Sequence, residues 1–181
     1  PRDRANLCVR AAEALLRGTS DMGVHMELHK CIPAGAGLGG GSSNAASVLR
    51  AVPRLLNLDV PEEEIQEIAA MLGSDIPFFL HDGSALASGR GEILTYFPYS
   101  CPWWIVLVVP DIHVSTAWAY ARLRLRKHPA DMDLHAALLR AEDHPKALEV
   151  ILHNDFEDAV IAAYPQIGHI KDRLRAGGAR G

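Results

Sequence analysis

The chain has 181 residues, with 18 Lys and Arg against 22 Asp and Glu, so its formal net charge is −4 with His neutral. Hydrophobic residues make up 49% of the chain and charged residues 22%, which is typical of a globular protein and excludes a disordered tail, a collagen or a coiled coil. The negative balance gives no electrostatic reason to expect a nucleic-acid partner. The longest apolar run, residues 103–109, is too short for a membrane span.

The cysteine and histidine patterns predict neither a disulfide framework nor a zinc site. Cys8, Cys31 and Cys101 are widely spaced and odd in number, so a reducing, cytosolic setting fits best. The nine histidines show no H-E-x-x-H or other ligand spacing, so we expect no metal ion held by protein side chains alone. His29, His113 and His153 have no predicted partner, and surface or capping roles are expected for them.

Both ends of the sequence are expected to be cuts through a longer protein. The chain begins with Pro1 and shows no leader peptide, and it stops at residues 177–181 directly after a helical pattern.

The first half of the chain alternates helical and strand patterns. Apolar spacing predicts a helix over residues 7–16, and strict alternation predicts a half-buried strand over residues 24–32. A glycine-rich loop follows at residues 33–41. A helix is then expected over residues 45–56, which Pro53 should kink or end.

The next elements are a capped helix, a hairpin and an apolar strand. Asp59 is the expected N-cap of a helix that has Pro61 at its first position and Gly73 as its stop. Glycine-rich hairpin material covers residues 83–94, and residues 103–109 predict a buried strand.

The last part of the chain is predicted to be helical. Ser115 or Thr116 can cap a helix that runs through Tyr120. From Asp131 onward the apolar spacing indicates helices, the last over residues 167–174.

The loop before the second predicted helix is the strongest functional signal in the sequence. Five glycines occupy the seven positions 35–41, at a cost in backbone entropy. That cost is reasonable where main-chain N–H groups must approach a phosphate closely at a helix N-terminus. The alternative is an ordinary tight turn, which needs only one or two glycines.

Two familiar nucleotide motifs match the loop only in part. Gly35, Gly37 and Gly40 satisfy G-x-G-x-x-G with Asp59 about 20 residues on, but no convincing strand leads into Asp59. An NAD-binding Rossmann module therefore stays only a remote alternative. A P-loop is rejected because Gly41 stands where its lysine belongs.

Residues 33–44, Pro-x-Gly-x-Gly-Leu-Gly-Gly-Gly-Ser-Ser-Asn, resemble the phosphate loop of the GHMP kinases. Residues 72–79 are similar to the segment that contains the catalytic aspartate of this family, and residues 110–120 resemble its entry into the second domain. With residues 89–92 and 154–157, the resemblance covers nearly the whole chain. It is strongest to the members that act on a cytidine diphosphate-linked alcohol.

The resemblance implies a set of site residues. The ATP-binding positions would be Pro33, Ala34, Gly35, Ala36, Gly37, Leu38, Gly39, Gly40, Gly41, Ser42 and Ser43. Asp75 would be the catalytic base and would contact the alcohol, and Tyr120 would present its ring to the cytosine. Mg²⁺ would arrive with ATP, and the hydroxyl of Ser42 or Ser43 could reach it.

Structural roles stay open for the same residues. Asp75 also suits a turn before Ile76-Pro77, and one of the two serines suits a helix cap. Tyr120 also suits a core position on an amphipathic helix. The lysine that pairs with the aspartate in this family would precede Pro1, and Lys30 does not match its motif.

The resemblance implies an α+β, two-lobed GHMP kinase fold. Residues 1–97 would form a nucleotide-binding lobe like ribosomal protein S5 domain 2, and residues 98–181 a ferredoxin-like substrate lobe. The implied reaction is ATP-dependent phosphorylation of the 2-hydroxyl of a cytidine diphosphate-linked methylerythritol in non-mevalonate isoprenoid precursor synthesis. Another GHMP kinase, of the homoserine or mevalonate type, is the alternative. The expected location is the bacterial cytoplasm or the plastid stroma, with no nucleic-acid or membrane partner.

Overall fold

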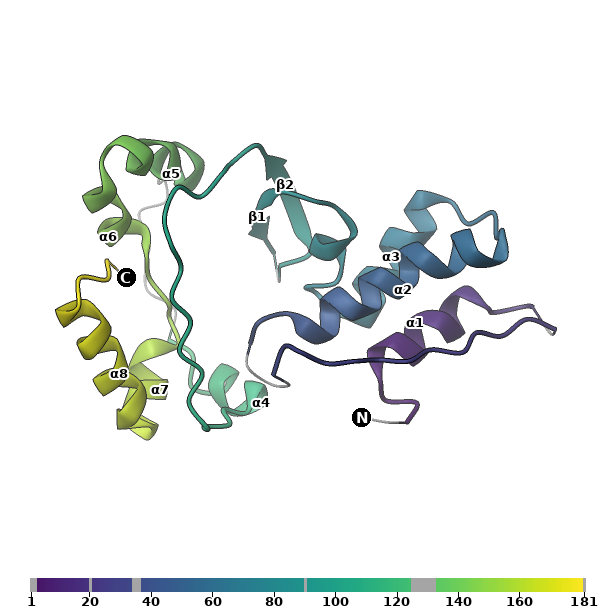
Figure 1. Ribbon diagram of the computed structural model, residues 1–181, viewed down its shortest axis with the longest axis horizontal. Helices are drawn as coiled ribbons and strands as arrows, with labels where there is room; N and C mark the ends of the chain where they lie inside the picture. The colour runs from purple at the N-terminus through teal and green to yellow at the C-terminus, as the bar shows by residue number, and fades with distance from the viewer. Residues whose placement is uncertain (1–2, 20, 34–36, 90, 125–132, 181) are drawn as a thin grey trace. The chain divides into compact units, whose positions relative to one another are not determined.

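The computed structural model describes residues 3–19, 21–33, 37–89, 91–124 and 133–180. The chain divides into two compact units, which we call unit 1 (Pro1–Ser100) and unit 2 (Cys101–Gly181). Helices and one β-hairpin make up the regular structure of the described residues (Figure 1). The predicted α+β content is therefore confirmed.

Unit 1 begins with three helices that pack against one another. They are α1 (Leu7–Leu15), α2 (Gly40–Leu56) and α3 (Glu62–Leu72), and α2 lies against both of the others (Figure 1). The side chain of Asn6 caps α1 by accepting a hydrogen bond of 2.9 Å from the N–H of Cys8. The first predicted helix is thus confirmed.

Helix α2 begins earlier than the sequence predicts and ends at Leu56, as expected. Its first turn includes the glycines, because the N–H of Ser43 donates to the carbonyl of Gly39 over 2.8 Å. The helix also runs three residues past Pro53, so the prediction that this proline ends it is wrong. Proline removes one backbone donor, but its ring is buried against the core, and the C-cap residue is Asn57, whose φ of 51° is left-handed.

Helix α3 ends where the sequence predicts but starts differently. Gly73 follows its last residue, as expected. Pro61, and not Asp59, stands at the N-cap position, where its carbonyl accepts from the N–H of Ile65 over 3.1 Å. The carboxylates of residues 62–64 lie in the first turn, where the helix dipole favours negative charge without a side-chain cap.

A short helix and a hairpin complete unit 1. The 3₁₀ helix η1 (Pro77–Leu80) leads into β1 (Ser84–Ser88) and β2 (Ile93–Phe97). The two strands are antiparallel, with Ser84 opposite Phe97 and Ser88 opposite Ile93. The predicted hairpin is confirmed, although its second strand extends to residue 97.

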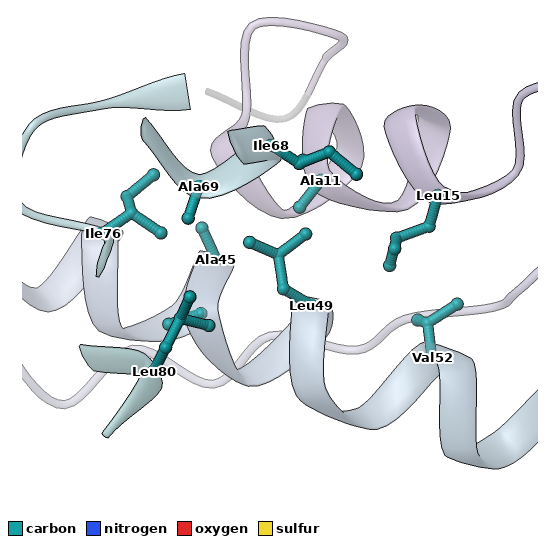
Figure 2. Packing of buried hydrophobic residues seen from close by; sticks show 10 residues of the cluster. Ala11, Leu15, Ala45, Leu49, Val52, Ile68, Ala69, Ile76 and Leu80 are labelled. Atoms are coloured by element: carbon teal, nitrogen blue, oxygen red, sulfur yellow. The ribbon is translucent and has the colours of Figure 1, made fainter. Parts of the chain in front are cut away.

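The core of unit 1 is built around one face of α2 (Figure 2). Leu49 and Ile76 are the largest side chains with no exposed surface. The remaining buried members of this cluster are Ala11, Leu15, Ala45, Ala46, Val52, Ile68, Ala69 and Leu80. Since they come from α1, α2, α3 and η1, the cluster fixes all four helices to one another.

Two segments predicted as strands form none in the described structure. Residues 24–32 pair with no strand, and Leu28 and Ile32 are 43% and 41% exposed. Residues 103–109 in unit 2 are likewise unpaired, and Trp104 is 98% exposed. Both predictions are wrong for the same physical reason: an alternating or apolar pattern becomes a strand only when a neighbouring strand satisfies its backbone N–H and C=O groups.

The apolar run at residues 103–109 does not belong to a helix either. Within the described ranges, no helix is both long and apolar enough to cross a membrane.

Unit 2 consists of short helices in its described residues. They are α4 (Thr116–Tyr120), α5 (Leu134–Asp143), η2 (Pro145–Ala147), α6 (Leu148–Ile151), α7 (Glu157–Ala163) and α8 (Pro165–Ala176). Ser115 caps α4 as predicted, and Asp133 caps α5 by accepting from the N–H of Ala136 over 2.9 Å. The predicted helix start at Asp131 lies outside the described residues.

Replacing Leu49 by alanine tests the packing of unit 1. Because Leu49 has no exposed surface, we expect Leu49→Ala to lower the free energy of unfolding by about 2–5 kcal/mol. The matched control is Leu55→Ala in the same helix, since Leu55 is 71% exposed and should change stability far less. Urea unfolding followed by circular dichroism measures both. A similar loss in the two variants would contradict this description of the core.

Candidate active site

The glycine loop reaches α2 through two left-handed residues. Gly37 and Gly39 have φ values of 71° and 67°, a backbone conformation that residues with a side chain rarely adopt. The predicted loop residues Ala34, Gly35 and Ala36 lie outside the described residues. Pro33 and Leu38 are exposed beside them.

The N-terminus of α2 has the properties of an anion site. In the part of the chain that the structure describes, no side chain caps this helix and its first turn has no acidic residue. The helix dipole and the N–H groups of its first turn therefore favour a negatively charged ligand. The predicted loop residues Gly40 and Gly41 lie in this turn.

The two serines of the loop are half-buried in the first turn of α2. The hydroxyl of Ser43 donates a long bond of 3.3 Å to the carbonyl of Gly40, so it takes part in the local structure of the helix and is not the N-cap. Ser42 has no hydrogen bond of this kind among the described residues. The hydroxyl of Ser42 is therefore the freer of the two for a ligand.

Asp75 lies in the turn between α3 and η1, and its side chain is exposed. The hydroxyl of Ser74 donates to its Oδ1 over 3.3 Å. The turn is closed by a bond of 3.2 Å from the N–H of Ile76 to the carbonyl of Gly73. Asp75 thus combines the turn position expected from its local sequence with a carboxylate that solvent and a substrate can reach.

The segment after Asp75 is firmly attached to unit 1. Ile76, Pro77 and Leu80 are buried, and Figure 2 shows Ile76 and Leu80 pointing into the core beside Ala45. From β2, the hydroxyl of Tyr96 donates weakly to the carbonyls of η1, at 3.4 and 3.3 Å. Partial burial raises the pKa of the Tyr96 phenol above its ordinary value.

Phe79 connects this segment to the glycine loop. A Cβ added to Gly39 would lie 2.5 Å from Cζ of Phe79, which shows that the ring rests on the loop backbone. This contact is not predictable from the sequence pattern, because it joins residues forty positions apart. The only signal for it was the pair of aromatic residues that follows Asp75 and Pro77.

Tyr120 ends helix α4 in unit 2 and is 61% exposed. The alternative prediction, that Tyr120 is a core residue, is therefore wrong. Its ring lies 5.1 Å from that of Phe156 in an edge-to-face arrangement. Such contact orients an aromatic ring while leaving one face available for stacking. Trp118 is half-buried instead, since it packs on Tyr164.

Elsewhere in the described residues, one histidine and one cysteine have environments that differ from the sequence expectation or affect their reactivity. His153, for which no partner was predicted, interacts with Asp155 at 2.9 Å, and neither side chain is fully exposed. Among the described residues, no three His, Cys, Asp or Glu side chains lie together as a metal site would require. Burial raises the pKa of the Cys8 thiol, which makes it a poor nucleophile.

The first half of the sequence matches a known domain family. Residues 6–83, which include the glycine loop, Asp75 and Phe79, match the family described as GHMP kinases N terminal domain. The chain therefore contains a GHMP kinase N-terminal domain, as its motifs predict.

Its relatives within that family share one name. The chain is 44% identical over 182 residues to the 4-diphosphocytidyl-2-C-methyl-D-erythritol kinase of Geobacter sulfurreducens, which covers 100% of this chain and 64% of that protein. It is 42% identical to the kinase of the same name from Chlorobaculum parvum, over 99% of this chain and 64% of that protein. The chain thus spans slightly less than two thirds of the length of these curated relatives.

A solved structure resembles the fold as well. The crystal structure of a 4-(cytidine 5'-diphospho)-2C-methyl-D-erythritol kinase matches with a TM-score of 0.76 and 34% sequence identity. The match covers 100% of this chain and 65% of that one. The GHMP kinase fold implied by the loop motif is therefore confirmed.

Gly37→Ala and Gly39→Ala form a matched pair that measures the ring contact. Both positions have a left-handed φ, so alanine costs about 1–2 kcal/mol at each. Only at Gly39 does the new methyl group also meet a ring, because none of the described residues lies within 4 Å of a Cβ at Gly37. Crowding of this kind costs about 1–3 kcal/mol, so Gly39→Ala should be the less stable variant by that amount in urea unfolding. Equal losses would show that Phe79 does not press on the loop.

Proposed function

We propose that the protein is an ATP-dependent kinase that phosphorylates the 2-hydroxyl of 4-diphosphocytidyl-2-C-methyl-D-erythritol, a step of non-mevalonate isoprenoid precursor synthesis. The observation that supports it most is the direct contact, within unit 1, between the glycine loop and the segment that contains Asp75. A phosphate-binding loop and a reachable carboxylate are the two parts that transfer to an alcohol needs. The shared name of the curated relatives supports this alcohol over homoserine or mevalonate.

In this proposal the glycine loop binds the triphosphate of ATP. The open space beside Gly37 and the uncapped first turn of α2 fit such a ligand, because a chain of oxygens can approach the backbone there. The predicted ATP-binding set is residues 33–43. Within it, we assign the contact with phosphate to Gly37 and to the first turn of α2.

The two serines and Mg²⁺ would complete the phosphate site. When bound with ATP, Mg²⁺ would supply positive charge that stabilises the phosphates during transfer. The hydroxyl of Ser42 is the better candidate for contact with the ion or a phosphate, since that of Ser43 bonds within the helix.

Asp75 would act on the alcohol. The hydroxyl oxygen attacks the γ-phosphorus of ATP and forms a new P–O bond, while the bond from this phosphorus to the bridging oxygen breaks and ADP leaves. The hydroxyl proton passes to the carboxylate of Asp75 as the new bond forms. The exposed position of Asp75 on a well-anchored turn suits this role.

Tyr120 would bind the cytosine ring. Its largely exposed ring is oriented by Phe156, and base stacking on such a ring is worth about 1–3 kcal/mol.

For the architecture, we propose that residues 1–97 are a nucleotide-binding lobe like ribosomal protein S5 domain 2 and that residues 98–181 are a ferredoxin-like substrate lobe. The cytoplasm or the plastid stroma stays the predicted location.

Asp75→Asn in the full-length protein tests the catalytic role. Asparagine suits the turn equally well, so the melting temperature should change little. Turnover should fall by about 10²–10⁴-fold, with a much smaller change in substrate affinity. The matched control is Asp82→Asn, which changes another exposed aspartate of unit 1. If Asp75→Asn keeps more than about a tenth of the turnover, Asp75 is a turn residue and not the base.

Two variants of Tyr120 test the nucleobase site. Tyr120→Ala should weaken binding of the cytidine-containing substrate by about 1–3 kcal/mol and leave ATP affinity nearly unchanged, as measured by calorimetry. Tyr120→Phe keeps the ring and should have little effect. Loss of both affinities in both variants would mean that the residue supports the fold of unit 2 instead.

A further inference from the structure

The ring of Phe79 fills the space that a side chain at residue 39 would need. A Cβ at Gly39 would lie 2.5 Å from Cζ and 2.9 Å from Cε2 of this ring, closer than real Cβ atoms approach other atoms. Gly39 directly precedes the first residue of α2. The ring therefore touches the backbone at the point where the glycine loop becomes a helix.

The chain between Asp75 and Phe79 is stiff. The N–H of Phe79 donates to the carbonyl of Ile76 over 3.0 Å, directly after the turn that closes around Asp75. Ile76 is fully buried, and the ring of Pro77 fixes its own φ. Phe79 and the Asp75 turn are thus joined by a short, hydrogen-bonded segment that is anchored in the core by Ile76.

A second side chain, that of Ile32, packs against the start of α2. A Cβ at Gly40 would lie 3.0 Å from Cγ2 of Ile32, so the segment that enters the loop packs against the start of α2. The first hydrogen bond of the helix runs from the N–H of Ser43 to the carbonyl of Gly39 over 2.8 Å. The backbone at Gly39 consequently has little freedom to follow a ring that moves.

We infer that Phe79 is a positioning residue, which sets the separation between the Asp75 carboxylate and the phosphate loop by pressing its ring on Gly39. The inference rests on the proposed function. It assigns to Phe79 no contact with ATP or the alcohol; the residue acts through the two segments that its ring holds together.

The consequence should appear in turnover more than in binding. Transfer requires the alcohol oxygen and the phosphorus to meet within a few tenths of an ångström of the productive geometry, and a misplacement of about 1 Å can cost about 10²-fold in rate. In the proposed function ATP is bound by the loop and the first turn of α2 and not by Asp75, so a shift of Asp75 leaves its binding site intact. Removal of the ring should therefore lower kcat and leave the KM for ATP almost unchanged.

The test compares Phe79→Leu with Phe78→Leu in the full-length protein. The two variants make the same chemical change at adjacent half-buried residues, but the atoms nearest to a Cβ at Gly39 all belong to Phe79. Initial rates of ATP-dependent phosphorylation are measured well below both melting temperatures. We expect kcat to fall at least tenfold for Phe79→Leu and less than threefold for Phe78→Leu, with the KM for ATP within about threefold in both.

A second experiment tests the contact between Phe79 and Gly39 by thermal stability alone, without an activity assay. Gly39→Ala should lower the melting temperature less in the Phe79→Leu background than in the wild type, because the shorter side chain relieves the clash with the new methyl group. Additive effects of the two substitutions on melting temperature would overturn the contact on which the inference depends.

The outcomes separate this inference from the proposed function. A wild-type protein that fails to phosphorylate the cytidine diphosphate-linked alcohol with ATP contradicts the proposed function. An active wild type whose kcat falls equally in the Phe79→Leu and Phe78→Leu variants contradicts only the positioning role.

Discussion

The packing of α2 against its neighbours is the interaction on which the rest of unit 1 depends. One face of this helix, centred on Leu49, is covered by α1, α3 and the segment that begins at Ile76. Its N-terminus is also the end of the glycine loop. The same hydrophobic contact that stabilises the unit therefore determines where the loop and the Asp75 turn lie. Since burial is non-directional, the closer fit between these two parts comes from the shape of the ring of Phe79.

Local interactions explain which elements could be predicted from the sequence. The helices have their hydrogen bonds and caps within a few residues, so apolar spacing and a cap residue such as Ser115 are sufficient to predict them. The hairpin is also local. Residues 24–32 and 103–109 have strand patterns, but a strand depends on a distant partner for its backbone bonds, and neither segment is paired in the described structure. The position of Pro53 inside α2 depended in the same way on tertiary burial.

The site was predictable to a similar extent. The glycine density and the residues around Asp75 were recognisable as motifs, because the chemistry limits which residues can occupy them. Their mutual arrangement was not, since it depends on a contact between Gly39 and Phe79 that lies forty residues apart in the sequence. The roles of the hydroxyls of Ser42 and Ser43 were also left open by the motif. The bond from Ser43 to the carbonyl of Gly40 distinguishes them.

The glycines of the loop satisfy more than one physical constraint. Their high density is therefore not explained by phosphate binding alone. A ligand that approaches the backbone explains Gly37, where φ is left-handed and the space beside it is open. At Gly39 and Gly40 the neighbouring groups are the protein's own side chains, Phe79 and Ile32. These two glycines are thus required by packing whether or not a phosphate is present. A run of glycines before a helix can therefore combine a binding surface with the contacts that hold this surface in place, and only the structure separates the two.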